Sequence, residues 1–150
     1  MIAIRRVLAP TDFSDSSVPA VRYAAELATK FGAELTLVHV VQDLTLVVPD
    51  VMMPTPVTTP ALADMVEAGK AGLAAFVKRV GLEGLRPTTE VRIGAPAAEI
   101  VTAAEELKAD LLCIGTHGRT GLAHFLLGSV AERIVRHAPC PVLTVRPPAK

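Results

Sequence analysis

The residues best suited to bind a ligand lie in the stretch 110–129, where an apolar run is followed by a glycine-rich turn. The run 111–114 is typical of a short, fully buried strand. Gly115-Thr116-His117-Gly118-Arg119 follows it, and glycine lets a backbone turn sharply and approach a ligand closely. Nine residues separate Gly118 from Gly128-Ser129, where a helical pattern begins. A strand, a glycine-rich turn and a new helix N-terminus together favour a site for an anion such as a phosphate.

A second polar segment, Pro10-Thr11-Asp12, follows the first expected strand. In open parallel sheets, ligands bind beyond the carboxyl ends of the strands, where the strand order reverses. If the strands that precede Asp12 and Gly115 are neighbours, one crevice holds both turns, with Val40-Val41 at the end of another strand nearby. This arrangement suits a nucleotide. Apolar side chains would flank the base, Asp12 would accept hydrogen bonds from base or ribose, and the glycine turn would hold phosphates.

The elements that must position these turns alternate between strand and helix. Apolar runs predict strands at residues 4–9, 35–41, 88–93, 111–114 and 142–145. Helical periodicity predicts one helix that ends near Phe31, others at about 61–80 and 129–137, and one that opens at Gly94-Ala95-Pro96. The alternation predicts an α/β fold, with a single domain over residues 1–150, a doubly wound parallel sheet of five strands and helices on both faces.

Some packing details follow from the same patterns. The inner side of the first helix is expected to hold Val21, Ala24, Ala25, Leu27, Ala28 and Phe31, and that of the third helix Ile100, Val101, Ala104 and Leu107. Gly32 is a natural stop for the first helix. Gly69 and Gly72 weaken the second helix but would let a neighbouring element pack close. Residues 42–60 hold four prolines and lack a regular pattern, which suits a lid, a binding loop, an interaction segment or an insert without a role.

The composition narrows the class of protein. Hydrophobic residues make up 51% of the 150 residues but aromatic ones only 3%, so aliphatic side chains build the core. Fifteen basic residues balance fifteen acidic ones, which gives no global attraction to nucleic acid or to an anionic membrane. No apolar run approaches the roughly 18 residues of a membrane span, and no signal peptide is recognised. Cys113 and Cys140 form neither a disulfide framework nor a zinc motif, so a cytoplasmic location is expected.

Several of the candidate residues have an alternative, purely structural role. Ser129 and Glu132 have the spacing of a capping box, in which Ser129 would satisfy its own helix. Asp12 could cap the first helix. His117 could be a catalytic base, but without a nucleophile or orienting carboxylate beside it in sequence, contact with phosphate or solvent is the simpler expectation. Arg119 is either a phosphate partner or a solvated loop residue, and His39 is interpreted as a hydrogen-bonded core residue.

The glycine spacing matches neither common phosphate motif, because the chain has no G-x-x-x-x-G-K-[ST] and no G-x-G-x-x-G after its first strand. G-x-x-G followed by nine residues and Gly-Ser resembles instead the signature of the universal stress protein family. The resemblance covers nearly the whole chain. It is carried by VLAPTDFS at 7–14, LVHV at 37–40, GAPAAEI at 94–100, IGTHGR at 114–119, GSVAE at 128–132 and CPVLTV at 140–145.

This resemblance implies strand order 3-2-1-4-5 and, because the glycine signature is intact, membership of the branch of the family that binds ATP, with Mg²⁺ or Mn²⁺ accompanying the triphosphate. It implies that Asp12 and Val40 contact adenine or ribose, and that Gly118, Arg119 and the backbone of Gly128-Ser129-Val130 contact the phosphates. No acidic pair is expected to serve as a dedicated metal site. The expected nucleotide-binding residues are Pro10, Thr11, Asp12, Val40, Ile114, Gly115, His117, Gly118, Arg119, Gly128, Ser129 and Val130.

The resulting expectation is an ATP-binding module that regulates other proteins in a stress response. Two alternatives remain: a slow ATPase or nucleotide-transferring enzyme, and a dimeric scaffold that binds no nucleotide. A phosphorylated receiver domain fits less well, because Arg92-Ile93-Gly94 stands where an acceptor aspartate is needed and Arg146-Pro147-Pro148 where a lysine is needed. The last strand, Val142 to Val145, is apolar and expected at a sheet edge, where an unpaired strand invites pairing. With the family resemblance, this predicts a two-fold homodimer.

Overall fold

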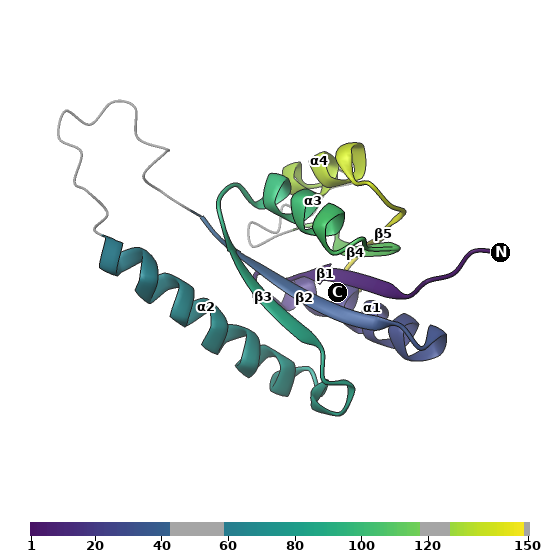
Figure 1. The fold of residues 1–150 in the computed structure, drawn as a ribbon, viewed down its shortest axis with the longest axis horizontal. Helices are drawn as coiled ribbons and strands as arrows, with labels where there is room; N and C mark the ends of the chain where they lie inside the picture. Colours follow the sequence, from purple (N-terminus) through teal and green to yellow (C-terminus); the bar gives the residue numbers. More distant parts are fainter. Residues whose placement is uncertain (43–58, 118–126, 149–150) are drawn as a thin grey trace.

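The computed structural model describes residues 1–42, 59–117 and 127–148, with side chains from residue 62 onward in the second range (Figure 1). Its five strands form one parallel sheet in the order β3-β2-β1-β4-β5, which confirms the predicted fold. The strands are β1 (Arg6–Pro10), β2 (Glu34–Val41), β3 (Thr88–Ile93), β4 (Leu111–Gly115) and β5 (Val142–Val145). The helices are α1 (Val18–Phe31), α2 (Thr59–Arg79), α3 (Pro96–Glu106) and α4 (Ser129–His137), and short 3-10 turns lie at Asp15–Ser17 and Glu83–Leu85.

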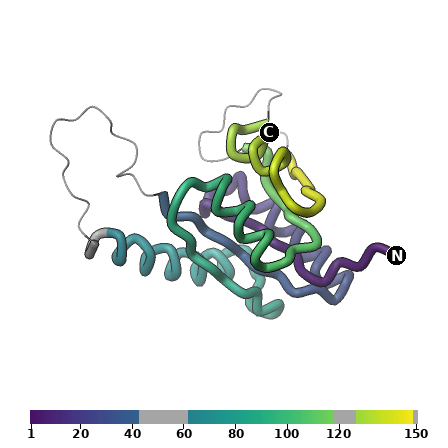
Figure 2. The backbone as a smooth tube through the Cα atoms, turned by 45° about the horizontal axis from the view of Figure 1, so that its top comes forward, coloured from purple at the N-terminus to yellow at the C-terminus, as the bar shows by residue number. Residues whose placement is uncertain are grey.

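Helices cover both faces of the sheet, with α3 and α4 above it and α2 below it in Figure 1, and Figure 2 shows the same backbone turned so that this upper side comes forward. Successive residues of a strand point to opposite faces. In β1, Val7 and Ala9 therefore pack with α1 and α2, whereas Leu8 packs with α3 and α4. The described residues of these helices present many buried alanines, including Ala24, Ala28, Ala103 and Ala104. None of the described helices is long and apolar enough to cross a membrane.

The ends of some elements differ from the prediction. β1 runs over Arg6–Pro10 rather than 4–9, and α2 begins at Thr59, so that Pro60 lies in its first turn, where proline is tolerated. The prediction that Phe31 faces the core is wrong, because 51% of this residue is exposed. Phe31 is the last residue of α1, and β2 starts three residues later, at the amino end of the sheet. Because the helix ends here, little of the sheet lies beneath the Phe31 ring. Gly32 ends the helix in the left-handed conformation, as expected.

The two glycines of α2 allow the close packing that their spacing predicts. A Cβ atom at Gly69 would lie 3.2 Å from the side chain of Val91 and 3.3 Å from that of His39, which belong to β3 and β2. A Cβ atom at Gly72 would lie 2.7 Å from the ring of Phe13. The glycines thus bring α2 directly onto the sheet and onto the turn that follows β1.

Candidate functional site

The two polar turns singled out in the sequence both lie at the carboxyl end of the sheet, after the neighbouring strands β1 and β4. β1 pairs with β4 through Val7 and Leu111 and through Leu8 and Leu112, so the two strands are neighbours. β2 and β3 lie on the other side of β1, which makes the gap between β1 and β4 the point where the strand order reverses. The strands that precede Asp12 and Gly115 are therefore neighbours, as a shared binding site requires. Ligands of doubly wound sheets bind at this point of reversal.

Backbone contacts join the two turns and the start of α4. A Cβ atom on Gly115, at the end of β4, would lie only 3.1 Å from the carbonyl oxygen of Ser16. The Gly128 N–H donates to the carbonyl oxygen of Thr116 at 2.8 Å, and a Cβ atom on Gly128 would lie 3.0 Å from that oxygen. Both glycines are therefore needed for backbone segments to touch, whatever they also do for a ligand.

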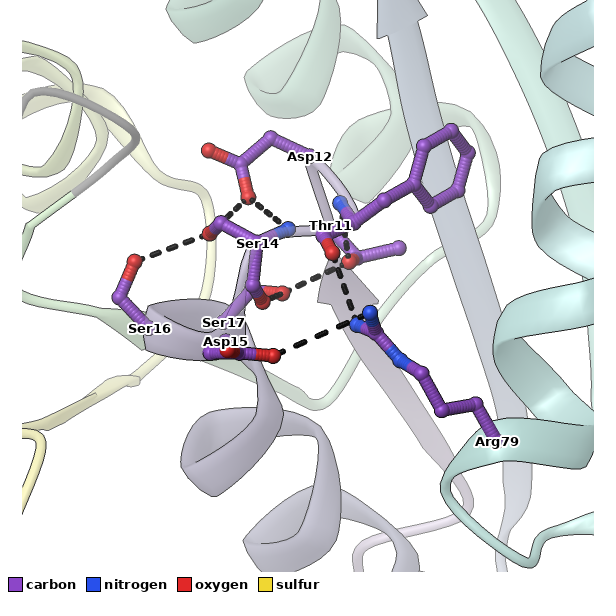
Figure 3. A network of polar contacts seen from close by, with 8 residues as sticks. Thr11, Asp12, Ser14, Asp15, Ser16, Ser17 and Arg79 are labelled. Carbon is purple, nitrogen blue, oxygen red and sulfur yellow. Dashed lines mark hydrogen bonds and ion pairs between the residues drawn. The ribbon is translucent and has the colours of Figure 1, made fainter.

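The turn after β1 is held by its own hydroxyl and carboxylate groups (Figure 3). Thr11, 5% exposed, accepts a hydrogen bond from the Phe13 N–H at 3.0 Å and shares one with the Ser17 hydroxyl at 2.8 Å. Asp12 Oδ1 accepts hydrogen bonds from the Ser14 N–H at 3.0 Å and from the Ser14 hydroxyl. Asp12 thus shapes the turn just ahead of the 3-10 helix, and a role in binding would come in addition to this one.

The turn after β4 contains a buried residue, Thr116, that was not among the predicted site residues. Thr116 is 6% exposed; its N–H donates to the Val145 carbonyl at 3.1 Å, and its hydroxyl lies 2.9 Å from His117 Nδ1. This contact orients the imidazole. His117 Nε2 is buried and has no hydrogen-bond partner among the described residues. The only signal for Thr116 in the sequence is its position next to the candidate His117. The hydrogen bonds of its backbone to Val145 and Gly128 cannot be inferred from the sequence.

The alternative role of Ser129, as the cap of its own helix in a capping box with Glu132, is excluded by the structure. Gly128, not Ser129, is the N-cap of the helix, and no side chain caps it. The reason is that the Gly128 N–H is already held by Thr116 and its carbonyl accepts from the Glu132 N–H at 2.8 Å, so the helix includes Ser129 as its first residue. Ser129 and Val130 are exposed. The first N–H groups of a helix lack intrahelical acceptors, so this end can receive an anion.

The other predicted site residues that the structure describes lie near the carboxyl ends of β1, β2 and β4. Pro10 is the half-buried last residue of β1, Val40 is half-buried in β2, and Ile114 is 3% exposed with its side chain in the core beneath α3 and α4. Gly118 and Arg119 lie outside the described residues. His39 is half-buried and donates from Nδ1 to the Thr11 carbonyl at 2.9 Å, in agreement with its interpretation as a hydrogen-bonded residue.

Two hollows in the described part of the chain lie away from this edge. One, of about 160 Å³, opens at the amino ends of the strands between Arg6, Glu34 and Leu107. The other, of about 420 Å³, lies between the end of α1 and the connection after α2. Neither brings together groups with evident chemistry, so the strand ends remain the candidate site.

Comparison with known proteins identifies the family. The model of the universal stress protein family matches residues 3–146. Universal stress protein MJ0531 of Methanocaldococcus jannaschii is 40% identical over 147 residues, or 97% of this chain and 84% of the relative. The structure of protein MJ0577 of the same organism superposes with a TM-score of 0.80 at 27% identity, covering 99% and 100% of the two chains. A universal stress protein in complex with cAMP superposes with a TM-score of 0.68 at 28% identity, covering 96% and 98%. With almost its whole length matched, this chain belongs to the universal stress protein family.

Proposed function

We propose that this chain binds ATP at the carboxyl ends of β1 and β4, and that it acts as a nucleotide-dependent regulatory module in a stress response. The proposal rests on two backbone contacts, that of Gly115 with Ser16 and that of Gly128 with Thr116. They bring the turn that carries Asp12 and the N-terminus of α4 together at the carboxyl ends of the strands. A relative with 28% identity was solved in complex with cAMP, itself an adenine nucleotide. ATP has the same parts, an adenine ring with a ribose and phosphates, and these suit a site made of a helix N-terminus at the carboxyl ends of the strands.

Each element would hold a different part of the nucleotide. Asp12 would accept hydrogen bonds from the ribose or adenine, and Val40 would contact the base. The N–H groups at Ser129 and Val130 would bind the phosphates, since a helix N-terminus attracts negative charge. Gly118 and Arg119 are proposed to complete the phosphate site. Pro10 and His117 would line the site, and the buried Thr11 and Ile114 would support it from within the fold.

A divalent cation would reach the site bound to the triphosphate. Within the described ranges, no group of three His, Cys, Asp or Glu side chains could hold a metal ion. Mg²⁺ keeps several waters and takes phosphate oxygens with one or two carboxylates, so Asp12 at this edge fits a cation that the nucleotide carries. EDTA should therefore weaken ATP binding, while the melting temperature measured without ATP stays unchanged.

The proposed module works in the cytoplasm as a two-fold homodimer joined along β5. β5 is an edge strand of the sheet, as the sequence predicts, and its residues Val142 and Leu143 are half-buried in the single chain. An apolar edge strand with unpaired backbone groups is a template for a second copy.

The first experiment is to release and identify the nucleotide in freshly purified protein by mass spectrometry, followed by titration calorimetry with ATP. Asp12→Asn keeps an oxygen for the Ser14 hydrogen bonds but removes the charge, and should weaken ATP binding about tenfold, as for the loss of one charge-assisted hydrogen bond. Glu26→Gln, which removes an exposed carboxylate from α1 away from this turn, is the control and should bind as the wild type does. Wild-type protein that takes up no ATP in the presence of Mg²⁺ would refute the proposal.

Slow hydrolysis of ATP is the second candidate function, and the geometry of His117 favours it. The Thr116 hydroxyl fixes the imidazole through Nδ1, and Nε2 is buried without a partner among the described residues. A positioned imidazole can act as a general base. ADP in the purified protein, together with turnover that His117→Gln abolishes while ATP still binds, would support this candidate. Bound ATP that stays intact for hours would exclude it.

A further inference from the structure

Phe13, the residue after Asp12, has a backbone conformation that a large side chain rarely adopts. Its φ is 67°, in the left-handed region, where Cβ crowds the following carbonyl oxygen. Such a conformation persists only where its surroundings enforce it. It also has a direct effect on the candidate site. The chain reverses immediately after Asp12, which returns the N–H and the hydroxyl of Ser14 to the Asp12 carboxylate.

The backbone of Phe13 is held at both ends. Its N–H donates to Thr11 Oγ1 at 3.0 Å, and its carbonyl oxygen accepts from the guanidinium of Arg79 at 2.7 Å. Arg79 belongs to the last turn of α2, 66 residues away in sequence, and its guanidinium also lies 3.8 Å from Asp15 (Figure 3). The guanidinium carbon lies 5.0 Å from the centre of the Phe76 ring, so an aromatic face supports it from the same helix.

The side chain of Phe13 is held by the same helix. Its ring stacks on His39 with centroids 4.2 Å apart and lies 6.1 Å from the ring of Phe76. The space exists only because residue 72 is glycine, since a Cβ there would lie 2.7 Å from the Phe13 ring. His39 in turn donates to the Thr11 carbonyl, so the ring stack and the backbone of the turn are parts of one network.

From these contacts we infer that α2 sets the shape of the turn that carries Asp12, with Arg79, Phe13 and Gly72 as positioning residues for the nucleotide. The inference rests on the proposed function, because the ligand it concerns is the proposed ATP. None of the three residues needs to touch the nucleotide. Because coupling between two sites is reciprocal, displacement of α2 weakens ATP binding, and bound ATP tightens the contact of α2 with the turn.

The test uses two variants that disturb the network from α2. Arg79→Ala removes the donor to the Phe13 carbonyl, and Gly72→Ala displaces the Phe13 ring. Lys78→Ala, an exposed cation of the same helical turn, and Gly84→Ala, where a Cβ meets nothing within 4 Å, are the matched controls. Hydrogen exchange of the Ser14 amide, measured without nucleotide, reports the turn directly. Titration calorimetry with ATP and Mg²⁺ reports the site.

Both variants should speed exchange of the Ser14 amide about tenfold and weaken ATP binding about tenfold, within the usual range of coupling between sites. Both controls should stay within about twofold of the wild type, and amides of β1 and β4 should keep their protection in every variant. Arg79→Lys keeps the charge and a donor, and should restore part of the affinity lost in Arg79→Ala.

The outcomes separate this inference from the proposed function. Wild-type protein that binds no ATP overturns the function, and with it the link of α2 to a nucleotide, whereas exchange at Ser14 still decides whether α2 shapes the turn. Unchanged Ser14 exchange in both variants overturns the role of α2. Faster exchange at Ser14 with unchanged ATP affinity overturns the link between the turn and the site.

Discussion

At the scale of single residues, Gly115 is placed where any side chain would separate the two turns of the candidate site. Its missing Cβ would lie 3.1 Å from the Ser16 carbonyl oxygen, a contact with backbone that cannot move aside freely. Gly115→Val should therefore lower the free energy of unfolding by about 1–3 kcal/mol, the usual cost of overpacking. Urea denaturation measures this change, and calorimetry should find weaker ATP binding in the same variant.

Gly84→Val is the control for this prediction, because a Cβ atom at Gly84 meets nothing within 4 Å. It should leave both the free energy of unfolding and ATP binding near the wild-type values. Equal stability of Gly115→Val and the wild type would mean that the contact with Ser16 is not needed.

Cys113 gives a second prediction at this scale. It is fully buried in β4, and burial raises the pKa of its thiol to about 12. In a Cys140→Ser variant, where Cys113 is the remaining cysteine, the thiolate fraction at pH 8 should be on the order of a thousandfold below that of a free cysteine. A disulfide reagent such as DTNB should then label the folded protein only as fast as it opens. Labelling within seconds, before any urea is added, would contradict the burial of Cys113.

At the scale of elements, Asp110 joins the start of β4 to the start of β1. Its Oδ2 accepts the N–H groups of Arg5 and Arg6 at 2.8 and 2.9 Å. These two backbone hydrogen bonds lower the pKa of Asp110 below its ordinary value of 3.8. Because the folded state holds the charged form, the resulting stability is fully present above the unfolded pKa. It is lost as the pH falls through the lower, folded pKa.

Asp110→Asn tests this effect, because it keeps an acceptor oxygen and removes the charge. It should be less stable than the wild type at pH 7, and the gap should close as the pH is lowered from about 5 towards 2. Thermal unfolding over this range measures it. Asp64→Asn, which removes an exposed carboxylate from α2, controls for net charge. A gap of the same size at pH 2 and pH 7 would show that the charge of Asp110 contributes nothing.

The elements also show how far the sequence could be interpreted. The alternation of apolar runs and helical periods was enough to predict a doubly wound parallel sheet, because the two periods differ and the turns between them are marked by glycine and proline. The strand order came from the family resemblance, since periodicity does not say which strands are neighbours. The range of α4 was predicted correctly but its N-cap was not, because a distant carbonyl, that of Thr116, holds the Gly128 N–H and makes Gly128 rather than Ser129 the N-cap.

The positions of the candidate residues were predicted to the extent that they follow strand ends. Asp12 and His117 are each the second residue after a strand, so the fold alone brings them to the carboxyl end of the sheet. The contacts around Phe13 could not be predicted, because Arg79 lies 66 residues away and no local pattern links an arginine to a particular carbonyl. Gly72 gave a partial signal, since a glycine inside a helix suggests close approach of a neighbour without naming it.

At the scale of the whole molecule, the two edges of the sheet differ in their chemistry. β3 carries Glu90 and Arg92, and Arg92 forms ion pairs with Glu90 at 2.8 Å and with Glu99 and Glu106 of α3. Charges of this kind discourage pairing with another chain. β5 is largely apolar, and its pairing with β4 is flanked by two backbone hydrogen bonds: Leu112 donates to the carbonyl of Pro141, just before β5, and Thr116 to the carbonyl of Val145. Residues 141, 143 and 145 thus face β4, because alternate residues of a parallel strand bond to the same neighbour. The backbone groups of Val142 and Thr144 therefore point away from β4.

This difference predicts a dimer through β5 that one substitution can break. Thr144→Pro removes an N–H that faces away from β4, so it should leave the fold intact and give a monomer. Thr144→Ser keeps that N–H and should stay dimeric. Light scattering coupled to size-exclusion chromatography at micromolar concentration measures both. A monomeric wild type would refute the prediction.

The central position of β1 has a consequence for synthesis on the ribosome. One of its neighbours, β2, follows soon after it, but the other is β4, and Asp110 at the start of β4 lies 104 residues after Arg6. At about 5–20 residues per second, β1 waits roughly 5–20 seconds for its second partner. During that interval, the side of β1 that later pairs with β4 and the apolar side chains that later contact β4 can bind other nascent chains. Ribosomal pausing before residue 111 would therefore lengthen the time during which the unpaired edge of β1 can aggregate.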